Sequence, residues 1–153
     1  MLGGQDKWRI RKATKSDASN VVSFLEKQRR PKRSDFAISD YFIAECSGNI
    51  VGCIALRNKE KLGYLYGLAV DRQWRRRGIG HALTQHGLDC LRKKGARSAF
   101  TLVMFWNIRF VKHHGFRVID KRSLRLVNLH QDFVDKWCAR SVLLVADLRQ
   151  PKS

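Results

Sequence analysis

A run of almost wholly apolar and aromatic residues passes without a break into an arginine- and glycine-rich segment, which then leads into an amphipathic helix. The apolar run covers residues 62–70, and the basic segment covers residues 71–80. A strand that is apolar on both faces belongs in the interior of a sheet that is covered on both sides. The sequence therefore predicts a mixed α/β fold built around a central strand, a loop and a helix.

The loop between this strand and this helix has the composition of a phosphate-binding site. The first turn of a helix has N–H groups without acceptors inside the helix, and the helix dipole adds positive charge there. Glycines let the chain turn tightly and let a ligand approach the backbone, and arginines add charge-assisted hydrogen bonds. These residues are Arg75, Arg76, Arg77, Gly78 and Gly80. An ordinary strand-to-helix connection is the alternative interpretation.

Two other phosphate loops do not fit this segment. A dinucleotide-binding fingerprint requires a glycine or alanine where this chain has Leu83, and a P-loop requires Gly-Lys-Ser or Gly-Lys-Thr, which is absent.

Hydrophobic periodicity and turn residues place the other elements. Strands are predicted at 8–11, 41–46, 50–56, 99–105, 116–119 and 142–148, and helices at 16–30, 79–94, 108–114 and around 129–137. Ser16 is the expected N-cap of the first helix, and Ser47-Gly48-Asn49 the expected hairpin turn. The stripe of the second helix is predicted to contain Ile79, Ala82, Leu83, His86 and Cys90.

The length of the chain predicts one domain. We expect it to cover residues 7–148, with a core at 7–120, a carboxy-terminal helix and strand at 121–148, and flexible ends at 1–6 and 149–153. No segment has the apolar length of a membrane span, and the first residues have no apolar stretch like that of a signal peptide, so we expect a soluble, cytoplasmic protein.

The charge of the chain is strongly positive. There are 31 Lys and Arg against 13 Asp and Glu, for a formal net charge of +18. Such a field attracts polyanions, but it does not distinguish a nucleic acid from a phosphate-rich cofactor or an anionic substrate. Zinc-finger spacing, a basic zipper and an aromatic RNA-binding strand signature are absent from the sequence, so we favour a basic enzyme over a nucleic-acid-binding module.

A metal site is not predicted. The four cysteines lie far apart without a Cys-x-x-Cys pair, and the five histidines form no His-Glu-x-x-His pattern. Buried, reduced thiols are the expected state of the cysteines.

Several segments together resemble the GCN5-related N-acetyltransferase (GNAT) superfamily. They are Leu68-Ala69-Val70-Asp71, Arg75-x-x-Gly78-x-Gly80 with Ala82-Leu83, and Phe110-Val111-Lys112-His113-His114-Gly115-Phe116. The resemblance covers residues 7 to 120 in element order. It implies a mixed, mostly antiparallel central sheet of about six to seven strands with helices on both faces. It also implies acetyl-CoA as the co-substrate.

The resemblance assigns the cofactor contacts. Arg75 and the backbone of Arg76, Arg77, Gly78, Ile79, Gly80 and His81 would hold the pyrophosphate. The backbone of Leu68, Ala69 and Val70 would pair with the pantetheine arm and orient the thioester carbonyl. Asn107 and Phe110, at the short helix, would complete the cofactor site.

The proton chemistry departs from the family pattern. Where many relatives place a glutamate on the central strand this chain has Tyr64, with Tyr66 on the same face, and where others place a tyrosine acid it has Val111. Tyr64, Tyr66 and His113 are therefore the candidate catalytic residues. Aromatic packing of the tyrosines and a solvent-exposed histidine at a helix end are the alternatives.

The acceptor is predicted to be the amine of a small molecule. The tail resembles a subgroup that acetylates small amino acids, through Phe133, Cys138 and Ser141, and the basic loop Arg29-Arg30-Pro31-Lys32-Arg33 could attract an anionic acceptor. Two alternatives stay open: a protein or peptide N-acetyltransferase, and a catalytically weak acyl-CoA-binding module whose basic surface binds nucleic acid. A homodimer is also open by analogy with relatives.

Overall fold

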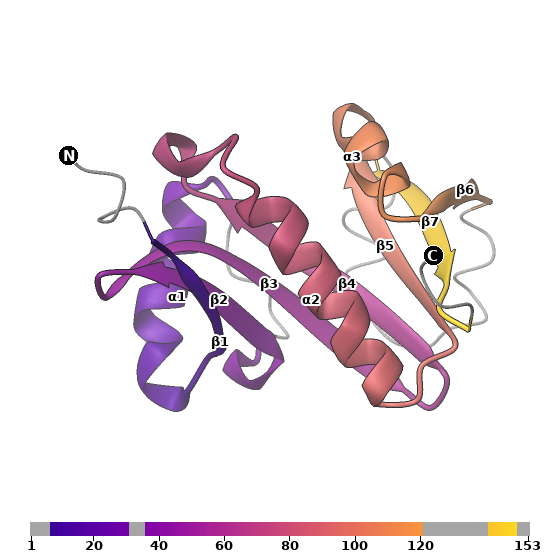
Figure 1. The fold of residues 1–153 in the computed structure, drawn as a ribbon, viewed down its shortest axis with the longest axis horizontal. Helices are drawn as coiled ribbons and strands as arrows, with labels where there is room; N and C mark the ends of the chain where they lie inside the picture. The colour runs from indigo at the N-terminus through magenta and orange to yellow at the C-terminus, as the bar shows by residue number, and fades with distance from the viewer. Residues whose placement is uncertain (1–6, 31–35, 121–140, 150–153) are drawn as a thin grey trace. The chain divides into compact units, whose positions relative to one another are not determined.

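A computed structural model describes residues 7–30, 36–120 and 141–149, and within them the chain forms a seven-stranded sheet (Figure 1). The hydrogen-bonded strand order is β1-β2-β3-β4-β5-β7-β6. Strands β4 and β5 run parallel, whereas the pairs β1–β2, β2–β3, β5–β7 and β6–β7 are antiparallel. The strands are β1 Arg9–Lys12, β2 Tyr41–Cys46, β3 Asn49–Lys59, β4 Leu62–Val70, β5 Ser98–Met104, β6 Arg117–Ile119 and β7 Ser141–Asp147. The predicted mixed, mostly antiparallel sheet is confirmed, with β4 in its interior.

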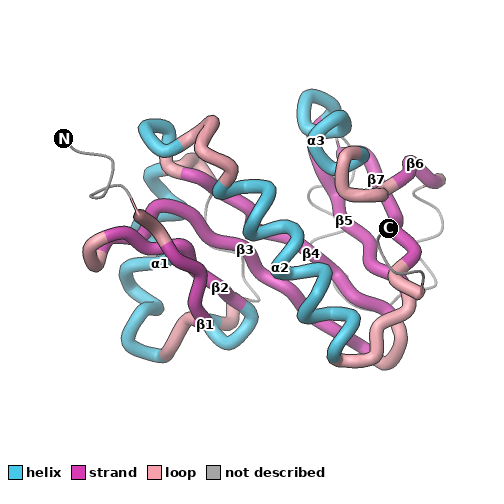
Figure 2. Tube along the Cα trace, viewed as in Figure 1, coloured by secondary structure: helices cyan, strands magenta, loops and turns pink. Residues whose placement is uncertain are grey.

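Three α-helices and four short 3₁₀ turns connect these strands in the described part of the chain (Figure 2). The α-helices are α1 Ala18–Lys27, α2 Ile79–Lys93 and α3 Ile108–Lys112, and the 3₁₀ turns are η2 Lys15–Asp17, η3 Ile38–Asp40, η4 Arg72–Trp74 and η5 Phe105–Asn107. Among these helices, none combines the length and the apolar character that crossing a membrane requires. The helix predicted around 129–137 lies outside the described residues.

The chain divides into two compact units. The first unit contains the described residues before Arg57 together with Gly67–Gly87, and the second contains Arg57–Tyr66 together with the described residues from Leu88 onward. The boundaries fall inside β3, β4 and α2. The expectation of a single domain over 7–148 stays a prediction.

In the first unit, α2 covers one face of the strands. A Cβ atom at Gly52 would lie 3.1 Å from side-chain carbons of both Ile79 and Leu83, so the helix rests directly on β3. On β2, the ring of Phe42 meets that of His86 edge-on with 4.7 Å between the centroids. His86 is thus a packed side chain of the helix, as its place on the apolar stripe predicts.

Helix α1 belongs to the opposite face of the first unit. Successive strand residues point to opposite sides, so Cys53 faces away from the side that Gly52 shares with α2. The guanidinium of Arg30, which follows α1, acts electrostatically on the Cys53 thiol. Figure 1 shows α1 behind the strands and α2 in front of them, which confirms helices on both faces.

In the second unit, β5 is held by β4 on one side and by β7 on the other. Leu62–Tyr64 pair in parallel with Ser98–Phe100. The Thr101 hydroxyl then donates a hydrogen bond of 2.9 Å to the carbonyl of Leu65. Strand β7 lies between β5 and β6, so the last described strand in the chain is inserted within the sheet rather than added at its edge.

Two local predictions are wrong in detail. Ser16 does not cap the first helix; instead the Asp17 carboxylate accepts a 2.7 Å hydrogen bond from the Thr14 N–H, and Asp17 N donates to Thr14 O at 2.9 Å, which closes η2 ahead of α1. The hairpin turn has two residues rather than three, because Cys46 pairs with Asn49. Both turn residues, Ser47 and Gly48, have φ above zero, as a type I′ turn requires.

The buried face of α2 also differs from the predicted stripe. Ile79 and Leu83 are buried as expected, but Cys90 is only half-buried. Toward the carboxyl end of the helix the buried residues are Leu88 and Leu91. In the second unit a Cβ at Gly63 would lie 2.7 Å from a methyl carbon of Leu91. The glycine on β4 therefore selects Leu91, one position beyond Cys90, as the residue that enters the core.

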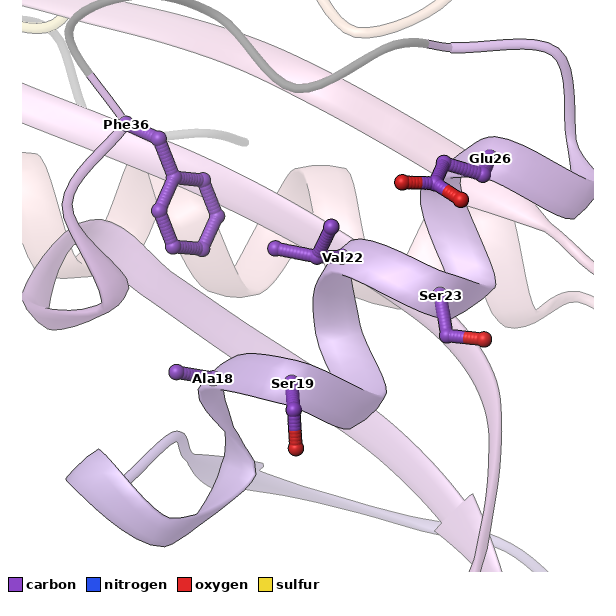
Figure 3. Close-up of a pocket in the computed structure, with 6 residues that line it drawn as sticks. All are labelled: Ala18, Ser19, Val22, Ser23, Glu26 and Phe36. Carbon is purple, nitrogen blue, oxygen red and sulfur yellow. The ribbon is translucent and has the colours of Figure 1, made fainter.

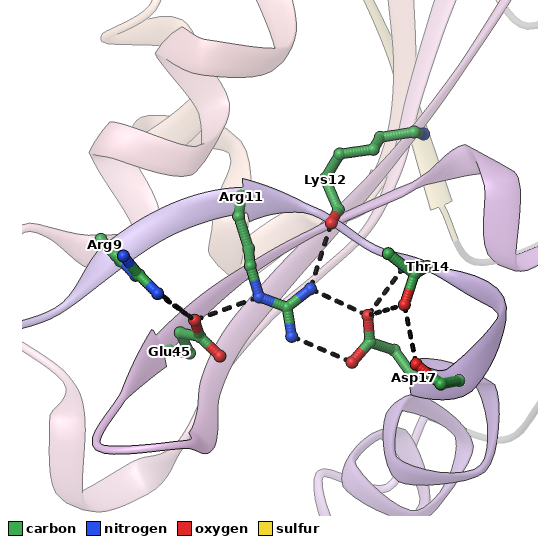
Figure 4. Close-up of polar contacts among 7 residues, drawn as sticks. Arg9, Arg11, Lys12, Thr14, Asp17 and Glu45 are labelled. Carbon is green, nitrogen blue, oxygen red and sulfur yellow. Dashed lines mark hydrogen bonds and ion pairs between the residues drawn. The ribbon is translucent and has the colours of Figure 1, made fainter.

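A charged network ties β1 to β2 and to the start of α1 (Figure 4). The Arg11 guanidinium donates to both carboxylate oxygens of Asp17, at 2.9 and 3.0 Å, and its Nε lies 3.1 Å from the Glu45 carboxylate. Arg9 lies 3.2 Å from the same Glu45 oxygen. The hydrogen bond from Arg11 is the main cause that holds the pKa of Asp17 well below its usual range, and it lowers the pKa of Glu45 as well.

Replacing Asp17→Asn should lower the free energy of unfolding at neutral pH by about 1 to 3 kcal/mol, because the charged acceptor of Arg11 is lost. A carboxylate with a lowered pKa stabilises the fold fully above its unfolded pKa, which is about 4 for Asp. This contribution disappears as the pH falls through the lower pKa of the folded state. Urea denaturation at neutral pH and at about pH 3 measures both effects.

The matched control is Asp89→Asn, which removes an exposed carboxylate that pairs with Arg92 at 3.0 Å. Exposed pairs contribute little, so this variant should unfold close to the parent. Equal unfolding midpoints for the two variants at neutral pH would show that the Arg11–Asp17 pair does not stabilise the fold.

Candidate functional site

The loop from Arg75 to Gly80 presents backbone N–H groups to solvent. Arg76 and Gly78 have φ of 66° and 82°, so two left-handed residues alternate with residues of other conformations before α2 begins. Positive φ values at two nearby residues turn the chain sharply between η4 and the start of α2. The first i→i+4 hydrogen bond of the helix runs from Ala82 N to Gly78 O, 3.0 Å. The N–H groups of Ile79 and Gly80 come before this bond, so the helix itself offers them no carbonyl acceptor.

The glycines of this loop are accessible. Gly78 is exposed, and a Cβ built on it would meet no atom within 4 Å. Gly80 is half-exposed, whereas Ile79, between the two glycines, is buried on the face of the helix that packs against the sheet. The space around Gly78 is therefore open to a ligand.

The arginines of the loop are held in different ways. Arg75 Nε donates a 3.3 Å hydrogen bond to the carbonyl of Val70 at the end of β4. The guanidinium carbon of Arg77 lies 4.5 Å from the centre of the Trp74 ring, a cation–π contact. The Asp71 carboxylate accepts from Gln73 N at 2.9 Å and closes η4. Strand and turn thus each hold one guanidinium group of the loop, that of Arg75 and that of Arg77. His81, also predicted to contact the pyrophosphate, follows this loop and is exposed on the first turn of α2.

The strand segment Leu68–Val70 follows a change in backbone direction. Gly67, inside β4, has φ of 67°, a conformation in which the chain leaves the extended path. A Cβ there would lie 3.2 Å from the hydroxyl of Tyr41. A glycine within an apolar strand marks a bulge or a close approach, so the sequence contained this signal, although our sequence analysis did not use it.

Behind this bend lies a buried thiol. The Sγ of Cys53 is 3.5 Å from the carbonyl oxygen of Gly67, and the side chain has no exposed surface. Burial raises the pKa of the Cys53 thiol to about 12. It is therefore protonated at neutral pH and is not a nucleophile.

Arg30 extends from the end of α1 toward the same part of the first unit. The helix ends in a Schellman motif: Arg30 N donates to Leu25 O at 2.8 Å and Arg29 N to Glu26 O at 3.0 Å, with Arg29 at φ 60°. The Arg30 side chain is largely exposed to solvent, yet its pKa is lowered, first by desolvation and then by the like charge of Arg75. Among the described residues, the charged groups that act on this guanidinium are the Cys53 thiol and the Arg75 guanidinium, and no carboxylate is among them.

The second unit brings the two candidate tyrosines together. The ring of Tyr64 stacks on Tyr66 with 5.0 Å between centroids and on Phe100 with 4.5 Å. Both tyrosines are buried, Tyr64 completely, and the Arg57 guanidinium lies 5.4 Å from the centre of the Tyr66 ring. Neither Phe100 nor Arg57 was singled out from the sequence, because β5 and β3 reach the tyrosines only through strand pairing.

The other predicted residues of the second unit lie on and around α3. Asn107 precedes the helix, Phe110 lies within it, and His113 follows it as an exposed residue. The ring of His114 lies 5.4 Å from Phe110 and 5.6 Å from His113. The helix ends before Gly115, whose φ of 90° is the predicted glycine stop.

Part of the predicted acceptor site lies outside the described residues. This holds for Pro31, Lys32 and Arg33 in the basic loop and for Phe133 and Cys138 in the tail. Ser141 is described: it begins β7, is buried, and pairs in register with Met104 of β5.

A separate, shallow hollow lies along α1 (Figure 3). Its lining comes from one side of the helix and from the aromatic residue before η3, namely Ala18, Ser19, Val22, Ser23, Glu26 and Phe36. None of the residues predicted to bind the coenzyme or to react lines this hollow. The predicted residues lie elsewhere: the loop before α2 and residues 68–70 belong to the first unit, and Tyr64, Tyr66 and the residues on and around α3 belong to the second.

Known proteins resemble this chain in sequence and in fold. The uncharacterized N-acetyltransferase CT2212 from Chlorobaculum tepidum is 33% identical over 85 residues, which are 55% of this chain and 54% of that protein. The N-acetylglutamate synthase from Neisseria gonorrhoeae, solved with coenzyme A and L-arginine, superposes with a TM-score of 0.76 at 25% identity and covers 94% of this chain. Arabidopsis thaliana Naa50, solved with a bisubstrate analogue CoA-Ac-MVNAL, shares the fold with a TM-score of 0.71 at 18% identity, over 92% of this chain and 98% of its own.

The extent of these matches differs. This chain spans about half the length of the Chlorobaculum protein and 34% of the Neisseria synthase chain. The acetyltransferase (GNAT) family model matches residues 8–116, from β1 to the end of the α3 region. The matched range contains the loop before α2 and the strands on either side of it. On the strength of that match, this chain belongs to the acetyltransferase (GNAT) family.

Proposed function

We propose that this chain is an acetyl-CoA-dependent N-acetyltransferase that acts on the amine of a small molecule through a single domain of residues 7–148. The observation that supports this most directly is the loop before α2. Its left-handed Arg76 and Gly78 expose N–H groups at a helix start, and its arginines are fixed beside them. A diphosphate fits that arrangement, because it needs several donors and positive charge in one place.

The coenzyme would lie along the first unit from this loop toward β4. We propose that Arg75 and the backbone of residues 76–81 hold the pyrophosphate. The backbone of Leu68, Ala69 and Val70 would then pair with the pantetheine arm, which the change of direction at Gly67 supports by turning these peptide groups away from the preceding extended path.

Acetyl-CoA supplies an activated thioester, and the acceptor amine attacks its carbonyl carbon so that the C–S bond breaks and the amine proton is transferred to the departing thiolate. The chain would orient the carbonyl with backbone N–H groups of β4 and would move the proton. Direct attack is supported by the buried Cys53, because a thiol with a pKa near 12 does not form a covalent intermediate at neutral pH.

We propose Tyr66 and Tyr64 as the groups that move the proton, with His113 as a third candidate. The stacking of both rings fixes the positions of their hydroxyls, and the Arg57 cation over the Tyr66 ring favours a partial negative charge on that side chain. His113 follows α3 and is exposed, so its ring can exchange a proton with solvent.

The proposed acceptor is an amino acid or an analogue that carries a carboxylate. Arg30 supports this, since a cation that lies near Arg75 without an acidic partner among the described residues is satisfied best by an anion from outside the protein. The Neisseria N-acetylglutamate synthase, by its name, forms an acetylated amino acid, which agrees with this class of acceptor.

The function is tested by the release of coenzyme A thiol from acetyl-CoA in the presence of separate amines. Amino acids with a free carboxylate should give the fastest turnover, compared with polyamines, aminoglycosides and basic peptides. If a basic peptide gave the fastest turnover, the acceptor would be assigned to the protein or peptide class and not to small molecules. Stabilisation by acetyl-CoA without thiol release from any amine would show that the chain binds the coenzyme but is not an enzyme.

The coenzyme site is tested in the same protein by a matched pair, Gly78→Asp and Gly78→Asn. Both residues tolerate a positive φ and fit the open space, but only aspartate places a negative charge against the diphosphate. Gly78→Asp should bind acetyl-CoA at least about tenfold more weakly than Gly78→Asn by calorimetry, a difference of about 1.4 kcal/mol. Equal affinities would mean that the diphosphate lies elsewhere.

Removing the hydroxyls should separate catalysis from packing. Tyr66→Phe and Tyr64→Phe keep the stacked rings, so the melting temperature should change little. If the hydroxyls move the proton, kcat should fall by a factor on the order of 10² in the more important of the two variants, while the KM for acetyl-CoA stays constant. His113→Gln belongs in the same series. Unchanged kcat in all three variants would leave these side chains with a structural role.

The anionic acceptor is tested with Arg30→Gln, and Lys27→Gln on the exposed end of α1 is its control. Loss of the Arg30 charge should raise the KM for a carboxylate-bearing acceptor about tenfold and leave its uncharged amide analogue unaffected. A rise in the KM for acetyl-CoA instead would assign Arg30 to the coenzyme.

A further inference from the structure

Most of the positive charge of this chain lies outside the proposed coenzyme loop. With 31 Lys and Arg against 13 Asp and Glu, a site for one diphosphate accounts for only a small part of the excess. The rest of the excess is of most interest at a place, among the described residues, where cations from separate elements gather without acidic partners.

Such a place lies at one end of the second unit, where three segments meet. The turn between β3 and β4 contacts the start of β5, since Arg97 N and Ser98 N both donate to Lys61 O, at 2.7 and 3.3 Å. Leu148 N, after β7, donates to Arg97 O at 2.8 Å. The Asn58 side chain donates to the Lys94 carbonyl at the end of α2, 3.4 Å away. Figures 1 and 2 show the β3–β4 turn and the end of α2 side by side.

The β3–β4 turn, the end of α2 and the residue before β5 contribute exposed cations to this surface, which we call the basic end; the segment after β7 contributes none. It consists of Lys59, Lys61, Lys93, Lys94 and Arg97. In the described part of the chain none of these five side chains forms an ion pair. The neighbouring acids are already used by other arginines: Asp89 pairs with Arg92 at 3.0 Å, and Asp147 pairs with Arg149 at 2.8 Å. Glu60 is the remaining carboxylate within these segments.

The helix dipole explains only part of this cluster. Cations in the last turn of a helix stabilise it, which accounts for Lys93 and for the adjacent Lys94. Lys59 and Lys61 lie on a strand turn and Arg97 precedes a strand, where no such benefit exists. Five like charges brought together by three chain segments repel one another, and a bound polyanion removes that repulsion.

We propose that the basic end binds the phosphate backbone of a nucleic acid, as a site separate from the coenzyme loop, which precedes the other terminus of α2. The chemistry of the surface favours this partner over two others. Binding at a membrane surface uses apolar side chains that enter the lipid, and protein interfaces use aromatic anchors. The exposed large apolar side chains among the described residues are Phe105, Trp106 and Val118, and none belongs to the basic end. Lysines in a polar surface match a backbone of regularly spaced phosphates, and they predict affinity with little sequence preference.

The test uses the full chain and a fluorescently labelled duplex DNA of about 20 base pairs, with single-stranded RNA of the same length as a second arm. The variant Lys93→Gln, Lys94→Gln and Arg97→Gln removes three charges from the basic end. The control variant Lys7→Gln, Lys15→Gln and Lys27→Gln removes three exposed charges from the first unit, so both variants have the same net charge. Anisotropy titrations from about 50 to 200 mM salt give the affinity and its salt dependence.

The parent and the control should bind with similar affinity, and the basic-end variant should bind at least tenfold more weakly. The slope of log K against log salt should decrease by about 2 to 3 in that variant, because each lost phosphate contact removes nearly one released counterion. All three proteins should bind acetyl-CoA equally, which also shows that they are folded. The duplex and the single strand decide which nucleic acid is preferred.

Two outcomes would overturn the proposal. Equal losses in the two variants would mean that net charge alone, and not the basic end, attracts the nucleic acid. Absence of binding by the parent at the lowest salt would exclude the interaction, and binding of anionic phosphatidylserine vesicles in its place, lost in the basic-end variant, would assign the surface to a membrane. Since none of these measurements involves acetyl transfer, the proposal stands or fails independently of the proposed function.

Discussion

The close approach of α2 to β3 at Gly52 is the contact on which the candidate coenzyme site depends. A side chain at this position would lie 3.1 Å from Ile79 and Leu83 and 3.2 Å from the carbonyl of Ala69. The absence of a Cβ therefore lets helix and strands pack with little space between them. The next residue back, Val51, accepts a 2.8 Å hydrogen bond from Asp71 N. The same two residues of β3 thus fix both the entry of the loop and the first turn of the helix that follows it.

This arrangement explains how a loop with two left-handed residues can be ordered. Arg76 has a side chain and occupies a region of φ that costs free energy for most residues. The surrounding contacts impose it: Arg75 is bonded to the end of β4, Arg77 rests on Trp74, and α2 is held by the sheet. A preorganised loop of this kind does not need to rearrange when it binds a ligand, which reduces the entropic cost of binding.

The positive charge of the chain serves two different kinds of structure. In the loop, the Arg75 guanidinium donates a hydrogen bond to the Val70 carbonyl, and the Arg77 guanidinium makes a cation–π contact with Trp74. These contacts restrict the positions of both side chains, which would suit recognition of one diphosphate. In the basic end, lysines with flexible side chains lie on turns and at a helix terminus, and only their approximate positions are set. If the two proposals hold, the first arrangement would give geometric selectivity, whereas the second would give a diffuse field that steers long polyanions.

Much of the fold could be predicted from local pattern. The apolar run of β4, the glycine stops after α2 and α3, and the two-strand hairpin each have a signal within a few residues, and the structure places them within one to three residues of the prediction. What failed depends on contacts that residue spacing does not show. Leu91 rather than Cys90 enters the core because Gly63, distant in the sequence, leaves room for it. Asp17 rather than Ser16 closes the turn ahead of α1 because its carboxylate accepts hydrogen bonds from Thr14 N and from Arg11.

The same distinction applies to the candidate site. The phosphate loop could be predicted because its arginines and glycines lie within six residues of one another, and its role stays a prediction. The stack of Phe100 on Tyr64 and the cation over Tyr66 could not be read from spacing alone, since strand pairing creates them. Side chains that act on protons are therefore the part of the site that sequence reasoning defines least.

The proximity of Arg30 to Arg75 has a practical consequence for anyone who handles this protein. If Arg30 binds an anionic acceptor as proposed, small oxyanions in the solution would compete for the same guanidinium. Sulfate, phosphate or citrate in a storage or crystallisation medium would occupy that position, raise the thermal stability and act as a competitor of the natural ligands. Measurements in a chloride medium with an amine or zwitterionic buffer would thus report tighter apparent affinities than measurements in phosphate.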